Sequence, residues 1–224
     1  MAQKRKKDAN SSKQTLTRER VIEGAIYLAD RSGTDQLTIR KLADYLGSAP
    51  MSLYYHIQSK DLLIDAMVEH VFAQITTPPE HEHWKSAIRV RCLSVREVLK
   101  RHWWAPPLME SRDYPGPENL RHLNAVIGCF RRAGFSIELC AHAYAVLDSY
   151  LYGFALEEAS LPSQEDGALQ AIGASIVERL SSSKLEYLAE LTTKHVLQPG
   201  YSFGASFEFG LDLLLDGIER ALFE

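Results

Sequence analysis

Two short amphipathic segments, joined by a glycine within Thr38–Lys60, restrict the fold of this chain more than any other feature. The first segment is expected to be a helix from about Thr38 to Leu46, with the Thr38 hydroxyl capping its free backbone N–H groups. Gly47 then supplies the permissive backbone that a sharp turn after a helix needs. One apolar face recurs at the helical spacing i, i+3, i+4 and i+7, and it comprises Ile39, Leu42, Ala43 and Leu46.

A second helix is expected from about Ala49 to His56, where Pro50 is tolerated in the first turn and Leu53 points inward. Two short helices joined in this way predict a helix-turn-helix, whose second helix enters the DNA major groove. A supporting helix is expected from Thr17 to Arg31, with its buried face formed by Val21, Ile22, Ala25, Leu28 and Ala29. Ser59 is placed to cap a fourth helix from Lys60 to about Ile75, whose inner side comprises Leu63, Ala66, Met67, His70 and Val71.

The charge distribution agrees with a small DNA-reading unit on an acidic body. Residues 1–60 hold 11 Lys and Arg against 6 Asp and Glu, a net charge of +5, and the remaining residues hold 14 against 23, a net charge of −9. Residues 1–15 are polar and are expected to form a disordered basic arm. This arm either contacts phosphates or serves as a solubilising tail, and the sequence favours neither alternative.

The segments LTIRKLADYLG and SLYYHIQSKDLL resemble the TetR family of bacterial transcriptional regulators, over about Thr17 to Val71. The resemblance implies an all-α fold, in which an N-terminal three-helix helix-turn-helix DNA-binding domain precedes a helical ligand-binding and dimerisation domain. The polar segment Thr76–His83, in which two prolines end the fourth helix, places the boundary between domains at residues 16–75 and 76–224. The resemblance also implies that Tyr54, His56 and Lys60 contact phosphates, whereas Ala49, Pro50 and Ser52 lie toward base edges.

The complete set of expected DNA contacts comprises Thr38, Arg40, Ser48, Ala49, Pro50, Ser52, Tyr54, Tyr55, His56 and Lys60. Arg40 is the one guanidinium among them that is expected to reach a guanine. The alternatives are that Tyr54 packs beneath its helix and that His56 simply closes the turn. Because the tip of the second helix is poor in donors, base preference is expected to depend on apolar contacts and DNA shape as well.

The rest of the chain is expected to form five helices, with two further short ones possible. The first, Trp84–His102, places Trp84, Ile88, Cys92, Val95, Leu99 and His102 on one stripe, and its basic residues are expected to form a solvated face that comprises Arg89, Arg91, Arg96, Lys100 and Arg101. A short irregular helix at most is expected in Trp103–Ser111, and a turn at Asp113–Pro117. The next helix, Glu118–Ala133, is expected to point Leu120, Leu123, Ile127 and Phe130 inward. Further helices are expected at Ser136–Ala159, Ser183–Leu197 and Phe203–Leu222, and Leu161–Gly173 reads as a loop, with a helix possible at Ala168–Leu180.

The last helix carries an apolar stripe that would expose a large patch on a monomer, so we expect a homodimer through a four-helix bundle. The alternative is that this stripe packs within its own chain. The residues expected at the dimer interface are Leu139, Val146, Tyr150, Phe154, Phe203, Phe207, Leu211, Leu214, Ile218 and Leu222.

In the resembled family a small molecule binds in the body and lowers the affinity for the operator, so an effector of unknown identity is expected here. The residues expected to line its pocket are Ile88, Cys92, Val95, Trp103, Met109, Leu123, Ile127, Tyr144, Leu147, Asp148 and Leu151. Leu108 stands where the tetracycline-repressor branch places a magnesium-binding histidine, and leucine cannot ligate a metal. Glu80–His83 are neighbours on a Pro-containing linker that do not converge on one ion, so no metal and no cofactor is expected.

Other classes of protein are less well supported. The sequence lacks the phosphate-loop, zinc-protease and dinucleotide motifs, so no enzyme is expected. A helical protein-interaction adaptor and a TetR-like activator remain the alternatives to a repressor of double-stranded operator DNA. The three widely spaced cysteines and the lack of any apolar run of about 20 residues are typical of a cytoplasmic protein without a membrane span.

Overall fold

The computed structural model describes residues 15–111, 115–161, 168–180 and 185–223. Throughout these ranges the regular elements are helices, without a strand, which confirms the all-α fold. The chain divides into two compact units, Met1–Met67 and Val68–Glu224, which are described separately below. The expected domain limits, 16–75 and 76–224, stay a prediction, and residues 1–14 of the expected basic arm lie outside the described residues.

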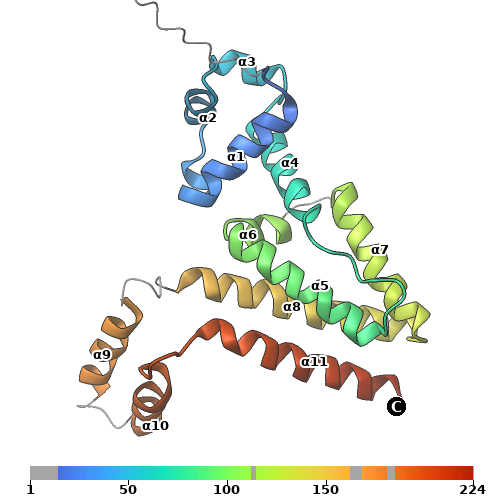
Figure 1. Cartoon of the computed structure of the whole chain (residues 1–224), viewed down its shortest axis with the longest axis vertical. Helices are drawn as coiled ribbons and strands as arrows, with labels where there is room; N and C mark the ends of the chain where they lie inside the picture. Colours follow the sequence, from blue (N-terminus) through green and yellow to red (C-terminus); the bar gives the residue numbers. More distant parts are fainter. Residues whose placement is uncertain (1–14, 112–114, 162–167, 181–184, 224) are drawn as a thin grey trace, which may run out of the picture. The chain divides into compact units, whose positions relative to one another are not determined.

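The N-terminal unit is built from short capped helices (Figure 1). Hydroxyl caps begin three of them: Thr17 accepts from the Arg20 N–H at 3.2 Å, Thr38 from the Lys41 N–H at 3.2 Å and Ser59 from the Leu62 N–H at 3.1 Å. The predicted caps at Thr38 and Ser59 are therefore confirmed. The helices are α1 (Arg18–Ser32), α2 (Ile39–Leu46), α3 (Pro50–Tyr54) and α4 (Lys60–Phe72), with a 3-10 turn at Thr34–Gln36.

The core of this unit is apolar. Leu53 is the one residue that α3 buries, at 0 % exposure, and it fixes α3 on the layer below. Its fully buried neighbours are Val21, Ala25, Leu42, Leu63 and Met67. Two expectations for the buried faces are corrected: Leu28 is half-buried while Ile26 takes the inner position on α1, and His70 is exposed on α4.

The turns around α3 set its length. Gly47 adopts the left-handed conformation expected of it, with φ 64°, and closes α2 with its N–H on Asp44. The predicted helix to His56 is too long, because α3 ends at Tyr54. Both the His56 and the Ile57 N–H groups bond to the Leu53 carbonyl at 2.9 Å, which turns the chain and buries Ile57.

The second unit contains the remaining helices. They are α5 (Trp84–Arg101), α6 (Ala105–Glu110), α7 (Pro117–Arg132), α8 (Ile137–Ser160), α9 (Ala168–Leu180), α10 (Glu186–Leu191) and α11 (Ser206–Leu222). The chain continues from α10 into a π-helical turn at Thr192–Val196, and a 3-10 turn at Phe203–Ala205 precedes α11. The helical alternative at Ala168–Leu180 is thus the one observed, while residues 112–114 of the expected turn lie outside the described part.

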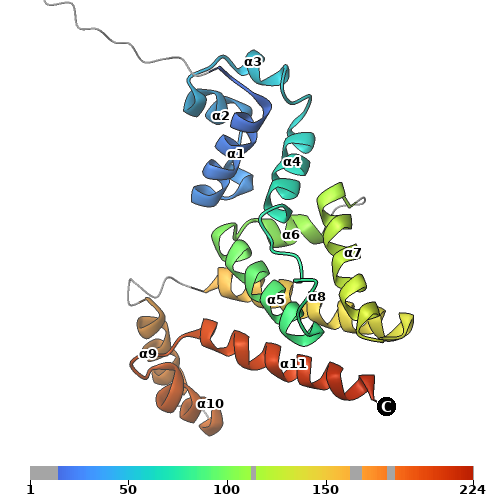
Figure 2. The ribbon, with the colours of Figure 1, turned by 45° about the vertical axis from the view of Figure 1, so that its right-hand side comes forward.

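Helices α5, α8 and α11 pack side by side in both ribbon views (Figures 1 and 2). The buried residues of α11 face α5 and α8 and comprise Phe207, Leu211, Leu215 and Ile218. On α7 the expected inward position of Leu120 is wrong, since this side chain is 49 % exposed. The buried stripe of α7 is instead His122, Val126, Cys129 and Phe130.

The C-terminal half of α4 is held by α7 within the second unit. Glu69 accepts a hydrogen bond from the Glu118 backbone N–H at 2.8 Å, and it thereby caps the first turn of α7 from outside that helix. The Phe72 ring lies 6.2 Å from the His122 ring, centroid to centroid. Within the described residues, no helix is both long and apolar enough to cross a membrane.

Candidate DNA interface and effector site

The recognition helix α3 presents large side chains to solvent. Met51 is 72 % exposed, Tyr54 45 % and Tyr55 90 %, and Pro50 at the first position also lies open. A five-residue helix anchored by Leu53 alone therefore leaves most of its surface for a partner. Met51 is absent from the set of expected contacts, although its residue type suits a thymine methyl group and its side chain is exposed.

Most of the expected DNA contacts are exposed on the N-terminal unit. Thr38, Arg40, Ala49, Pro50, Tyr54, Tyr55 and Lys60 are exposed, whereas Ser48, Ser52 and His56 are half-buried. The Thr38 hydroxyl is occupied by its cap. The Ser48 hydroxyl oxygen is enclosed by protein, so its expected contact through this atom is corrected.

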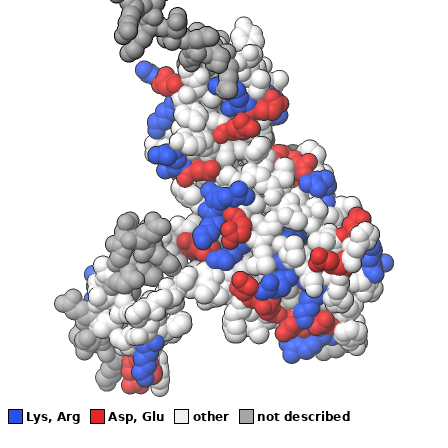
Figure 3. All heavy atoms as spheres, in the orientation of Figure 1, with Lys and Arg blue, Asp and Glu red and all other residues white. Residues whose placement is uncertain are grey.

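Lys60 stands in the first turn of α4, where backbone N–H groups point outward and favour an anion. Its ammonium and the Arg40 guanidinium give this unit two exposed cations close in sequence to α3. Over the face drawn in Figure 3, Lys and Arg side chains are interspersed with Asp and Glu.

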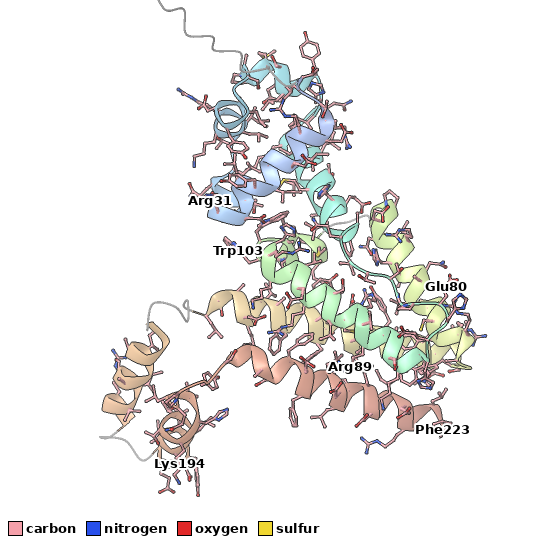
Figure 4. The ribbon with its side chains drawn as sticks, viewed as in Figure 1. Arg31, Glu80, Arg89, Trp103, Lys194 and Phe223 are labelled. Atoms are coloured by element: carbon pink, nitrogen blue, oxygen red, sulfur yellow. The ribbon has the colours of Figure 1, made fainter. Side chains whose placement is uncertain are left out.

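Of the basic residues expected on a solvated face of α5, Lys100 and Arg101 are exposed, whereas Arg89 and Arg96 are half-buried and Arg91 is buried. Lys85 contacts Asp216 at 2.7 Å and Glu219 at 2.6 Å, and Arg89 contacts Asp212 at 2.7 Å and Glu208 at 2.6 Å. Figure 4 shows Arg89 directed from α5 toward α11. These ion pairs join α5 to α11, because acidic residues recur on α11 at the spacing of helical turns.

Arg96 is also paired rather than solvated. Its guanidinium contacts Glu158 at 2.8 Å and lies 4.9 Å from the centre of the Phe207 ring. Phe154, Phe203, Phe207 and Tyr150 form an aromatic cluster at this junction, and the Tyr150 hydroxyl donates to the Phe207 carbonyl at 2.8 Å.

A group of polar side chains lies inside the body, and we call it the interior polar cluster. Arg91 on α5 is 5 % exposed and His122 on α7 is 1 % exposed. Helices α5, α6 and α7 each pack on α8, and these four helices contribute the cluster, which comprises Arg91, His122, Tyr144, Asp148 and Tyr152 together with the exposed Glu110. Tyr144 and Asp148 were expected in the effector pocket, whereas the other four members of the cluster were not predicted from the sequence.

Burial dominates the protonation of this cluster. It raises the pKa of Asp148, against the opposing effects of Arg91 and of the hydrogen bond from Tyr144. Burial, followed by repulsion from Arg121 and Arg91, lowers the pKa of His122 to about 4. His122 is therefore neutral at physiological pH, in the interior of the body and in contact with α4.

Most residues expected to line the effector pocket are buried or half-buried in the second unit. Ile88, Cys92, Val95, Met109, Leu147 and Leu151 are buried, and Leu123, Ile127, Tyr144 and Asp148 are half-buried. The expected place of Trp103 in the pocket is wrong, because this side chain is 42 % exposed (Figure 4). Its neighbour Trp104 is buried and packs on His102. A separate surface hollow of about 470 Å³ lies between residues 79–84 and the ends of α7 and α11, and it contains none of the expected pocket residues.

The residues expected at a dimer interface divide into two groups. Phe207 and Leu211 are 0 % exposed, and Phe154 and Ile218 are buried as well, so they contact their own chain and are corrected as interface residues. Val146 is 44 % exposed, and the others, Leu139, Tyr150, Phe203, Leu214 and Leu222, are half-buried. The outer face of α11 instead carries Phe209 at 70 % and Leu213 at 56 % exposure.

Comparisons with known proteins agree with this architecture. The family model described as "Tetracyclin repressor-like, C-terminal domain" matches residues 77–222. The chain is 29 % identical to an HTH-type transcriptional regulator of Saccharopolyspora erythraea, over 92 % of this chain and 86 % of that protein.

Solved structures are similar as well. A TetR variant of Acinetobacter baumannii in complex with minocycline superposes with a TM-score of 0.65 and 26 % identity, over 93 % of this chain and 99 % of that one. The TetR family protein ActR of Streptomyces coelicolor, in complex with actinorhodin, has a TM-score of 0.75 over 94 % and 100 % of the two chains, and at 24 % identity it shows the fold alone. The match over most of the body, together with the helix-turn-helix that precedes it, establishes that the chain belongs to the tetracycline-repressor-like, or TetR, family of DNA-binding transcriptional regulators.

Proposed function

We propose that this regulator is a homodimeric repressor that binds a palindromic operator through α3 and releases it when a small molecule enters the body. The observation that carries the proposal is the surface of α3, where Met51, Tyr54 and Tyr55 stand exposed on a helix with one buried anchor. A surface of this kind suits a groove of DNA, because it offers apolar contact to thymine methyl groups and hydroxyls to phosphates.

A homodimer follows from the limited reach of one helix-turn-helix. Two copies related by a two-fold axis place their recognition helices about 34–36 Å apart, one turn of DNA. The exposed residues Val146, Phe209 and Leu213 support pairing through α8 and α11. Gly153 and Gly217 add open backbone on these two helices, since a Cβ at either position would meet nothing within 4 Å.

The small-molecule effector is supported by the interior polar cluster and its apolar surroundings. The minocycline complex belongs to a TetR variant, and for this chain we propose a ligand in the corresponding body without proposing that it is a tetracycline. A ligand that binds the released conformation more tightly lowers the affinity for DNA, and the coupling is reciprocal.

The test is selection of genomic DNA fragments by the full-length protein, followed by titration of the enriched duplex at two salt concentrations. We expect enrichment of a palindrome, with affinity that falls steeply with salt. Sedimentation of Leu213→Glu tests the dimer, and Lys100→Glu on α5 is the charge-changed control. Leu213→Glu should be a monomer that no longer binds the operator, whereas Lys100→Glu should remain a dimer that binds it. Equal affinity for all fragments would refute the proposed operator.

A further inference from the structure

Within the described residues, the buried guanidinium of Arg91 has no carboxylate at contact distance. Its side chain is 5 % exposed, and its Nε atom has no hydrogen-bond partner. Among the residues that the structure describes, no ion pair includes Arg91. The contrast with Lys85, Arg89 and Arg96 on the same helix is direct, because each of those contacts at least one carboxylate.

Such an arrangement is unfavourable in a ligand-free protein. A buried charge is normally paired and hydrogen-bonded, because removing it from water is costly. The Cys92 side chain also interacts with Arg91, but sulfur is a weak acceptor. Asp148 interacts with Arg91 at longer range and directs its own hydrogen bond to Tyr144.

His122 provides a second unused polar atom in the same interior. Its ring is 1 % exposed and its Nδ1 atom also has no hydrogen-bond partner. Arg91 acts on His122 electrostatically, which places both groups in one region between α5 and α7. The His122 ring also faces Phe72 of α4, so a molecule bound beside it would adjoin the helix that leads to the DNA-binding unit.

From these contacts we propose that the effector is an organic acid, whose carboxylate or other acidic oxygen binds the Arg91 guanidinium beside His122. The inference rests on the proposed function and names the chemical class of ligand for its effector site. Guanidinium groups match carboxylates in two-pronged geometry, so an acid fits the free side of Arg91 better than a neutral or cationic molecule does. The apolar residues around the cluster, such as Ile88, Val95 and Leu147, suit the hydrocarbon part of such an acid.

The first test requires no ligand. In ligand-free full-length protein, Arg91→Met removes an uncompensated buried charge while Asp148 keeps its hydrogen bond to Tyr144. We expect the thermal unfolding midpoint to rise by a few degrees. Arg101→Met, at an exposed position on the same helix, is the matched control and should leave the midpoint unchanged. A clear fall for Arg91→Met would mean that Arg91 is a structural partner inside the fold, and it would overturn the proposal.

The second test compares acids with their amides. We would measure the midpoint shift produced by 2-naphthoate against 2-naphthamide and by octanoate against octanamide. The acid should give the larger shift in at least one pair, and Arg91→Met should abolish this difference while Arg101→Met keeps it. Equal shifts for acid and amide, or an acid preference that survives in Arg91→Met, would contradict the proposal. If none of the four compounds binds, the ligand-free comparison decides.

The same variants separate this inference from the function on which it rests. With the enriched DNA duplex, the effective acid should release wild-type protein and leave Arg91→Met bound. If the wild-type protein binds no DNA selectively, the proposed repressor function fails, while the acid preference in the unfolding measurements still decides the ligand class.

Discussion

The recognition helix α3 and the body helix α5 place their polar side chains in opposite surroundings. On α3 the large side chains Met51, Tyr54 and Tyr55 are exposed, and Leu53 alone anchors the helix. On α5 the basic side chains Lys85, Arg89 and Arg96 are paired with α11 and α8, and Arg91 is buried. A surface that binds a large polyanion can stay hydrated until binding. A site for a small molecule must be enclosed, and enclosure raises the free energy of each unpaired charge inside it.

The largest effect is expected from removing the anchor of α3. Leu53→Asp introduces a carboxylate at a position with 0 % exposure, so we expect the N-terminal unit to lose at least about 3 kcal/mol and DNA binding to disappear. Calorimetry should still detect unfolding of the second unit. Met51→Asp, at an exposed position of the same helix, controls for the added charge and should leave the fold intact. If Leu53→Asp abolished the unfolding transition of the second unit together with that of the first, the division into two units would be wrong.

The next effect concerns His122 and pH. The unfolded-state pKa of a histidine is 6.5, and in the folded body it is lowered to about 4, so the unfolded chain binds more protons between these values. The contribution of the neutral His122 to the free energy of unfolding is therefore complete above about pH 6.5. As the pH falls toward 4 this contribution is lost, by on the order of 3 kcal/mol. His122→Leu should flatten this part of a stability–pH curve. His142→Gln, at an exposed histidine of α8, should leave it as in the wild type.

A smaller effect is expected from one phosphate contact of the N-terminal unit. Lys60→Ala should weaken binding about tenfold to all duplexes alike and lower the slope of log affinity against log salt by about one. Lys100→Ala, exposed on α5, is the control. A changed base preference in Lys60→Ala would show that this residue reads sequence instead of holding the backbone.

The smallest effect is expected at Arg89, although it contacts two carboxylates. Its side chain is 34 % exposed and its partners are more exposed still, so water screens the attraction. Arg89→Ala should change the free energy of unfolding by less than about 1 kcal/mol. A double-mutant cycle with Asp212→Ala measures the pair itself. A coupling several times larger would mean that the α5–α11 ion pairs stabilise the body more than exposed pairs normally do.

Sequence patterns predicted the N-terminal unit well because its signals are local. The caps at Thr38 and Ser59 and the left-handed Gly47 each depend on a few neighbouring residues. The end of α3 was missed because two hydrogen bonds to the Leu53 carbonyl, which no residue type specifies, turn the chain after Tyr54.

In the body the helices were predictable but several of their faces were not. Arg91 was assigned to solvent because arginine is seldom buried, although it stands on the buried stripe with Ile88, Cys92 and Val95 at the spacing i, i+3, i+4 and i+7. His122 shares a stripe with Val126 and Cys129 in the same way. The stripe of α11 was assigned to a partner because the sequence cannot tell whether an apolar face meets its own chain or another copy.

The measurement that tests the central claim most directly is equilibrium binding of the full-length protein to a labelled palindromic duplex obtained by genomic selection, with a scrambled duplex as competitor. We expect a dimer to bind the palindrome at least about a thousandfold tighter than the scrambled sequence. Leu53→Asp should lose this preference. Equal binding to both duplexes, or selective binding that survives in Leu53→Asp, would contradict the central claim.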